Sequence, residues 1–129
     1  MSNVSYSIEY SPPAPVLPVK LAVPGESPQD IAHFALIDTG ADGTFVPTSI
    51  LEELGLPIVY LANVRSYLGD KVHRLPVYMV DIILFDNLRL PNLEVVADDS
   101  DSTIILGRNV LNKLNLQLDG PNEAVNLNK

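Results

Sequence analysis

The 129-residue sequence predicts a single, mainly β domain. Its apolar residues come in short runs that are rich in Val, Ile and Tyr. These runs are interrupted about every eight to twelve residues by Pro, Gly, Asn and Asp. β-Branched and aromatic residues favour strands, and the interrupting residues favour turns. A chain of this length buries about two thirds of its unfolded surface, so it can hold a core without disulfides. We expect no second domain.

The candidate strands, taken in order, account for most of the chain. Four prolines fall between residues 12 and 18, where they cannot donate a continuous hydrogen-bond ladder, so we expect residues 11–18 to be a stiff linker between two edge strands. We therefore divide the chain into an N-terminal strand and Pro-rich linker over 1–15 and a main domain over 16–129. The expected strands are 4–10, 16–23, 31–37, 44–46, 58–66, 72–85, 88–96, 103–106, 114–118 and 123–127.

Two short helices and one hairpin complete the expected elements. Thr48 or Ser49 can cap a helix over 49–55, with Glu52 and Glu53 in its first turn and a glycine at its end. A second helix is expected over 108–115, after Gly107, because its apolar residues recur on one face. The sequence Asp-Gly-Pro-Asn at 119–122 is typical of a tight turn, so the chain should end in a hairpin.

Composition excludes several classes of function. Sixteen acidic residues against eight basic ones give a net charge of −8, which repels a phosphate backbone and argues against nucleic acid as a partner. The chain has no cysteine and two histidines, so we expect no thiolate metal site, no metal and no cofactor. Residues 1–15 lack the features of a signal peptide, and no apolar run approaches the ~20 residues of a membrane span. We expect no membrane partner and a cytoplasmic location.

Asp38 is the residue that raises the question of function. It follows the apolar run Ala35-Leu36-Ile37 and precedes Thr39 and Gly40. Burying an unpaired carboxylate costs several kcal/mol, so Asp38 is either a residue that forms a turn or caps a helix, or a group held under functional constraint.

Two motifs decide between these readings. Residues 35–47 read ALIDTGADGTFVP, and residues 104–111 read IILGRNVL. Together they resemble the retropepsin-like aspartic proteases, over roughly residues 16–118. The resemblance implies a closed, barrel-like fold in which Asp38 is the catalytic aspartate. It also implies that Thr39 ties two active-site loops together across a dimer, and that Gly40 faces the substrate.

The resemblance assigns supporting roles to four further residues. Asp42 would meet the substrate backbone, and Arg108 would pair with Asp42 through a partly buried, charge-assisted contact that holds the loop. Ile105 would line a substrate pocket. The small side chain of Ala41, like Gly40, would let a second carboxylate and a substrate backbone approach Asp38.

The chemistry requires a second carboxylate. Peptide hydrolysis by water needs one group that takes a proton and another that gives one, and two carboxylates sharing a single proton can do both. The sequence has one Asp-Ser/Thr-Gly motif, so one chain supplies half of this dyad. We therefore expect an isologous homodimer with the site on its two-fold axis, which binds an extended peptide as an added strand.

Some features stay open. The hairpin over 63–80 would be the flap, with Tyr67, Leu68 and Gly69 near its tip; these residues could cover the substrate, or the tip could be an ordinary exposed turn. The acidic run 97–102 could favour polar or basic substrate residues or be a solvated loop, and the two histidines read as surface residues.

The alternative function is a non-catalytic module that keeps the fold for peptide binding or dimerisation. The intact motif at Asp38 argues against this alternative, and the glycine-poor flap argues for it.

Overall fold

The structure is a computed structural model that describes residues 2–65, 71–100 and 102–128. In this part of the chain, strands predominate over two short α-helices and one 3-10 helix, as expected. The elements in chain order are β1 (Ser2–Ser5), β2 (Val16–Ala22), β3 (His33–Ile37), β4 (Thr44–Val46), α1 (Thr48–Glu52), β5 (Tyr60–Arg65), β6 (Val72–Leu84), η1 (Phe85–Asn87), β7 (Leu88–Ala97), β8 (Ile105–Leu106), α2 (Arg108–Leu111), β9 (Asn115–Asp119) and β10 (Ala124–Asn128).

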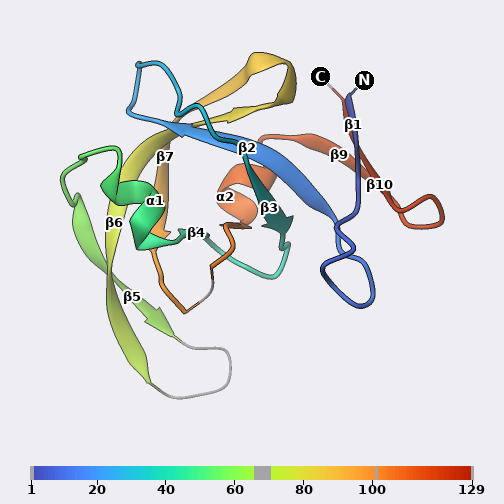
Figure 1. Cartoon of the computed structure of the whole chain (residues 1–129). Coiled ribbons are helices and arrows are strands. Elements are labelled where there is room, and N and C mark those ends of the chain that lie inside the picture. Colours follow the sequence, from blue (N-terminus) through green and yellow to red (C-terminus); the bar gives the residue numbers. More distant parts are fainter. Residues whose placement is uncertain (1, 66–70, 101, 129) are drawn as a thin grey trace.

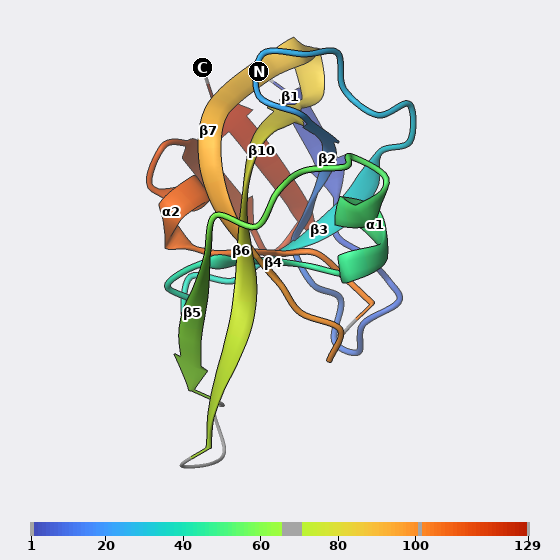
Figure 2. The same ribbon diagram turned by 90° about the vertical axis from the view of Figure 1, so that its left-hand side faces the viewer.

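A seven-stranded sheet in the order β2-β3-β8-β4-β7-β6-β5 forms the body of the molecule. An additional pairing between β2 and β6 closes six of these strands into a barrel, which confirms the mainly β, barrel-like fold (Figure 1). Most neighbouring strands are antiparallel, but β3 pairs parallel with β8 and β4 pairs parallel with β7. β5 and the first part of β6 extend from the barrel as two arms (Figure 2).

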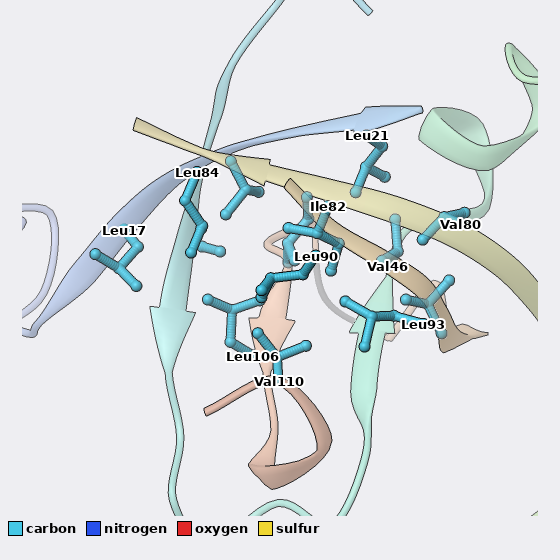
Figure 3. Packing of buried hydrophobic residues seen from close by; sticks show 14 of the residues in the cluster. Leu17, Leu21, Val46, Val80, Ile82, Leu84, Leu90, Leu93, Leu106 and Val110 are labelled. Atoms are coloured by element: carbon cyan, nitrogen blue, oxygen red, sulfur yellow. The ribbon is translucent and has the colours of Figure 1, made fainter. Parts of the chain in front are cut away.

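The core fills the barrel with aliphatic side chains from opposite walls. Leu21 of β2, Ile82 of β6 and Leu106 of β8 are fully buried, and Figure 3 shows them among the other apolar residues of the cluster. Burying each of these side chains stabilises the fold by roughly 1.5–3 kcal/mol relative to leaving it in water. β8, the short strand within the second motif, therefore contributes Leu106 to the packed interior.

A separate three-stranded sheet joins the two ends of the chain, in the order β1-β10-β9. The predicted C-terminal hairpin is confirmed as β9 and β10, whose register places Gln117 opposite Asn126. Glu123 in the connecting turn has a positive φ of 47°. β1 pairs antiparallel with the other edge of β10 and places Asn3 opposite Asn126. The N-terminal strand thus belongs to a sheet whose other strands lie near the C-terminus.

Asp81 is the one acidic residue among the buried residues of the described chain, with 1 % of its surface exposed. Its carboxylate accepts hydrogen bonds from the N–H groups of Gly25 (2.9 Å) and Asn92 (2.8 Å) and forms an ion pair with Arg89. Burial alone would raise the pKa of this carboxyl, but the hydrogen bonds from Gly25, Asn92 and Arg89 outweigh burial and hold the pKa below its ordinary value of 3.8. A fully satisfied buried carboxylate therefore connects three loop and strand segments.

The expected strand boundaries need several corrections. β1 covers Ser2–Ser5 instead of 4–10. Pro18 lies inside β2, as the strand expected over 16–23 implies, so the expected linker over 11–18 is too long. Pro18 is tolerated because it pairs with Phe34 on one side, while the pairing of β2 with β6 starts only at Val19. Five strands are one to three residues shorter than expected: β2, β3, β5, β6 and β8. β9 and β10 have the expected length but lie one residue further along the chain.

The predicted capping of the first helix is wrong. Pro47 is the N-cap residue and makes no side-chain cap, Thr48 already belongs to α1, and Glu52 is the last helical residue. The N–H of Thr48 donates instead to the carboxylate of Asp99, at 2.9 Å, from a loop that is distant in sequence. The second helix ends at Leu111, four residues earlier than expected, because a turn leads from it into β9.

Candidate active site

Asp38 lies directly after β3, where the two sequence motifs come together. β3 and β8 pair in parallel, with Ile37 opposite Leu106, and the N–H of Asp38 donates to the carbonyl oxygen of Leu106 at 3.1 Å. The strand of the second motif therefore holds the backbone of Asp38 in place. The side chain is half-buried at the surface end of this pair of strands.

The carboxylate of Asp38 is oriented by its own turn. Its Oδ1 accepts a hydrogen bond from the N–H of Gly40 at 2.9 Å, and its carbonyl oxygen accepts one from Ala41 at 3.2 Å. Such a contact is typical of an Asp that forms a turn. Within the described residues, no donor reaches the second carboxylate oxygen. A Cβ added to Gly40 would lie 3.2 Å from Oδ1 of Asp38, so glycine leaves the carboxylate uncrowded.

Arg108 holds the loop that carries this turn. Its side chain forms an ion pair with Asp42 and donates through Nη1 to the carbonyl oxygen of Thr39 at 2.8 Å. Its backbone N–H donates to the carbonyl oxygen of Ala41 at 2.9 Å. The contact between Arg108 and Asp42 is therefore present, as expected. It is not buried within one chain, because the side chain of Asp42 is 93 % exposed and that of Arg108 is 45 % exposed.

Three residues that were not predicted as site residues, Thr44, Gly107 and Asn109, support the loop from the interior of the molecule. Thr44 is fully buried, and its hydroxyl accepts from the N–H of Gly107 at 3.1 Å and donates to Oδ1 of Asn109 at 2.8 Å. The amide of Asn109 then donates to the carbonyl oxygen of Glu94 in β7 at 3.0 Å. Because Thr44 belongs to the first motif and Asn109 to the second, this chain of hydrogen bonds joins the motifs beneath the surface.

Gly107 is required by the close approach of two loops. A Cβ at this position would overlap the carbonyl group of Gly43 and lie 3.0 Å from the carbonyl oxygen of Ala41. A glycine between a strand and a helix is a signal that sequence reasoning could have used, because such a glycine often marks a close backbone contact. For Thr44, the corresponding signal was a hydroxyl residue at the start of a short strand whose other residues, Phe45 and Val46, are apolar.

The other expected site residues are placed as follows. Ile105 is half-buried in β8 and pairs with Phe45. Tyr67, Leu68 and Gly69, expected at the flap tip, lie outside the described residues. In the acidic run, Asp98 accepts from the N–H of Ser100 at 2.9 Å, and Asp99 holds α1. Within residues 2–65, 71–100 and 102–128, no group of three or more His, Cys, Asp or Glu side chains could hold a metal ion.

Two hollows on the described surface do not include Asp38. Residues such as Gln29, Ile31 and Glu53 line one, and residues such as Pro18 and Phe85 line the other. Neither is lined by residues 38–43. Asp38 is half-buried, and the side chains of Arg108 and Asp42 beside it are exposed. None of the helices in the described part of the chain is long and apolar enough to cross a bilayer.

The barrel and the Asp-Thr-Gly turn held by an arginine define a retropepsin-like aspartic protease fold. A family model described as aspartyl protease matches residues 29–110, which include the first motif and all but the last residue of the second, and the chain belongs to this family. Among curated proteins, no sequence matches the chain.

Solved structures of low sequence identity share the fold. A retropepsin-like aspartic protease from Rickettsia conorii matches with a TM-score of 0.67 and 12 % identity, over 98 % of this chain and 88 % of that one. The retroviral protease-like domain of Ddi1 from Leishmania major matches with a TM-score of 0.55 and 15 % identity, over 88 % of this chain and 89 % of that one. The EIAV protease in complex with the inhibitor HBY-793 matches with a TM-score of 0.54 and 21 % identity, over 85 % and 93 %.

Proposed function

We propose that the protein is a homodimeric aspartic endopeptidase in which Asp38 of each subunit supplies half of the catalytic dyad. The observation that carries the proposal is the Asp38 turn itself. One carboxylate oxygen is fixed by Gly40, and the whole loop is held by Leu106 and Arg108 on the barrel. A constrained carboxylate on a rigid sheet suits catalysis, because catalytic groups need positions fixed to a fraction of an ångström.

The two-fold arrangement follows from the need for two carboxylates. One chain carries one such motif, and the side chain of Asp42 beside it is 93 % exposed. In the proposed dimer, the ionised carboxylate takes a proton from the attacking water while the protonated one donates to the carbonyl oxygen of the peptide. The tetrahedral intermediate then collapses as the amide nitrogen gains a proton and the C–N bond breaks. The reaction needs no cofactor.

Substrate positioning is assigned to the rim of the same loop. The side chain of Asp42 is exposed while Arg108 holds it, so its free oxygen can accept an N–H from an extended peptide. Gly40 adds a backbone without a side chain beside the carboxylate, and the arms of β5 and β6 would lie over the peptide. We assign substrate contacts to Gly40, Asp42 and Ile105, and also to Tyr67, Leu68 and Gly69.

The test compares the wild-type protein with Asp38→Asn on a denatured protein substrate over about pH 4 to 7, with and without a statine inhibitor. The amide is nearly isosteric, so the variant should stay folded and dimeric while fragments disappear. Asp30→Asn, at an exposed acid outside the loop, is the matched control and should cleave like wild type. Fragments formed at the wild-type rate by pure Asp38→Asn would rule out the catalytic assignment. Peptide binding without cleavage by the wild-type dimer would instead favour a non-catalytic module.

A further inference from the structure

The two arms carry a charge opposite to that of the rest of the chain. Residues 58–77, which include both arms, contain three of the eight Lys and Arg residues and one of the sixteen Asp and Glu residues. Their net charge is therefore +2, and that of the remaining residues is −10. A region whose charge is opposite to that of its surroundings attracts ligands that the rest of the molecule repels.

The pairing of β5 with β6 places both arginines of the arms on one face. Side chains alternate between the two faces along each strand, and residues directly opposite each other share a face. One face carries the pairs Leu61–Pro76, Asn63–Arg74 and Arg65–Val72, and the other carries Tyr60–Val77, Ala62–Leu75 and Val64–His73. We call the first of these the arginine face.

The arginine face continues the inner side of the barrel wall. Val80 of β6 is fully buried in the core cluster, and Tyr78, two residues earlier, packs against the same cluster. Counting back further in steps of two leads to Arg74 and Val72. Val77, on the other face, is buried but does not belong to this cluster. The side of the sheet that fills the barrel therefore carries the arginines where the strands leave the barrel.

The arms extend on the side of the molecule where the candidate site lies. In Figure 1, the arrow of β3, which ends one residue before Asp38, points in the same downward direction as the arms. Figure 2 shows the arms below the body as well. An inner face that continues beyond the barrel on this side can contact a peptide bound at Asp38.

The two arginines have no counterion among the described residues. Arg65 and Arg74 are exposed, and neither forms an ion pair or a side-chain hydrogen bond within that part of the chain. They are diagonal neighbours across the two strands, so their Cα atoms are about 7–8 Å apart. Two like charges at this distance repel each other. A carboxylate between them relieves the repulsion and can accept hydrogen bonds from both guanidinium groups.

The carboxylates of the acidic run are less available than these arginines. Asp98 accepts a hydrogen bond from the N–H of Ser100, and Asp99 accepts one from the N–H of Thr48. Both carboxylates therefore already have backbone partners within the described chain. The unpaired charges on the inner side of the arms are positive, which favours acidic ligands over basic ones.

We propose that Arg65 and Arg74 select acidic side chains in the substrate, so that the protein cleaves peptides with Asp or Glu near the scissile bond. This inference rests on the proposed function, because it names the substrate class of the same site. Each substrate carboxylate accepts hydrogen bonds from the guanidinium groups. Neighbouring apolar side chains of the substrate cover Leu61 and Val72, which are 45 % and 50 % exposed. The two-fold axis of the proposed dimer presents two arginine faces, so acidic residues are selected on both sides of the scissile bond.

Digestion of a mixture of denatured proteins measures the selection without assuming a sequence. Mass spectrometry of the fragments should show Asp and Glu enriched on both sides of the cleavage sites, relative to their frequency in the mixture. Arg65→Glu/Arg74→Glu should shift this enrichment to Lys and Arg, whereas Arg65→Lys/Arg74→Lys should keep it on the acidic residues. A purely structural role of the arms would change the rate of cleavage and leave the sequence preference unchanged. Lys113→Glu, at an exposed cation outside the arms, is the matched control and should keep the wild-type preference.

Binding to Asp38→Asn tests the same contacts without cleavage. The probe is the peptide Ala-Val-Glu-Leu-Leu-Glu-Val-Ala, and its partner carries Gln in place of both Glu residues. In an NMR titration the Glu peptide should bind about tenfold more tightly than the Gln peptide, as expected for hydrogen bonds between charged groups. The difference should shrink as salt is added, and it should vanish when Arg65→Gln/Arg74→Gln is combined with Asp38→Asn.

The outcomes separate this inference from the proposed function. A wild-type protein that digests denatured proteins without enrichment of Asp or Glu would overturn the selection and leave the peptidase intact. Equal binding of the two peptides to Asp38→Asn, or a Glu preference that survives the loss of both arginines, would also overturn the selection. Tighter binding of the Glu peptide through both arginines, in a protein that digests nothing, would support the selection and count against the peptidase.

Discussion

The two ion pairs of the described chain use the same chemical groups in opposite environments. Arg89 and Asp81 form a pair whose carboxylate is 2 % exposed, and Arg108 and Asp42 form one whose carboxylate is 93 % exposed. Asp81 also accepts two backbone N–H groups, and Arg89 donates to the carbonyl oxygen of Glu26 at 2.5 Å. The first pair is complete within one chain. The second leaves hydrogen-bonding capacity at the surface, beside Asp38.

The difference separates a structural site from one suited to binding. A buried pair with every oxygen satisfied has nothing left to offer a ligand, and removing one partner strands a charge in the interior. An exposed pair contributes little to stability, because water and salt screen it. The hydrogen-bonding groups of such a pair can therefore bind a peptide or a second subunit. Substitutions in the buried pair and in the exposed pair should therefore affect stability and activity differently.

Asp81→Asn should be the most damaging single substitution. It removes the negative charge that satisfies Arg89 and replaces one carboxylate oxygen with a donor that faces backbone N–H groups. We expect the free energy of unfolding to fall by about 3–5 kcal/mol, the range found for breaking buried pairs. Urea unfolding followed by circular dichroism measures this. Asp42→Asn is the matched control, and an equal loss in the two variants would remove the distinction between the pairs.

Arg108→Ala should have a small effect on the isolated chain and a large one on activity. The exposed ion pair contributes about 0–1 kcal/mol, so unfolding of the monomer should change by about that amount. The exposure of Asp42 revises the expectation that the pair is partly buried. Peptide cleavage should fall by about tenfold or more, because the Asp38 loop loses the side chain that holds it in place. Unfolding measured below the dimerisation concentration tests the effect on stability, and cleavage measured above it tests the effect on activity. Cleavage at the wild-type rate by the variant would contradict the positioning role of Arg108.

Stability should depend on pH through Asp81 in a defined direction. Its folded pKa lies below the ordinary value of 3.8, so the carboxylate stabilises the fold above that value and the stabilisation is lost as pH falls through the folded pKa. The free energy of unfolding of the wild-type protein should therefore decline more steeply below about pH 4 than that of Asp81→Asn. Parallel curves for the two proteins would show that Asp81 does not titrate as inferred.

The smallest expected effect concerns an exposed contact between β5 and β7. Tyr60 donates to the carboxylate of Glu94 at 2.5 Å, and this hydrogen bond, followed by burial and by the charge of Glu94, raises the pKa of the Tyr60 phenol. Glu94→Gln should lower that pKa toward 10.0 with little change in stability. Ultraviolet titration measures it, and subtracting the curve of Tyr60→Phe isolates the signal of Tyr60. An unchanged difference curve would mean that the two side chains do not interact in solution.

The sequence was informative where the chemistry is local or carried by a motif. The Asp38 turn depends on residues adjacent in the chain, and the pairing of Arg108 with Asp42 was predicted from the two motifs. The alternation of strands and turns predicted the mainly β fold. The C-terminal hairpin followed from a recognisable turn.

The contacts that were missed depend on residues far apart in the sequence. Asp99 holds the start of α1 from a loop some fifty residues away, so the expected cap at Thr48 or Ser49 was wrong. The hydrogen bonds that join Thr44 to Asn109, and Asp81 to Gly25, appear only when the barrel closes. No local pattern marks such partners, because any buried polar side chain needs a partner and the fold decides which one it finds.

The pairing of β1 with β10 also sets an order of events during synthesis. Asn3 and Asn126, which bond across this sheet, are 123 residues apart. At translation rates of about 5–20 residues per second, β1 has been made for roughly 6–25 s before β10 exists. During this interval β1 has no β10 to pair with. Contacts between residues so far apart in the sequence slow folding. The sheet that joins β1 to β10 is therefore the last part of the described fold that can form.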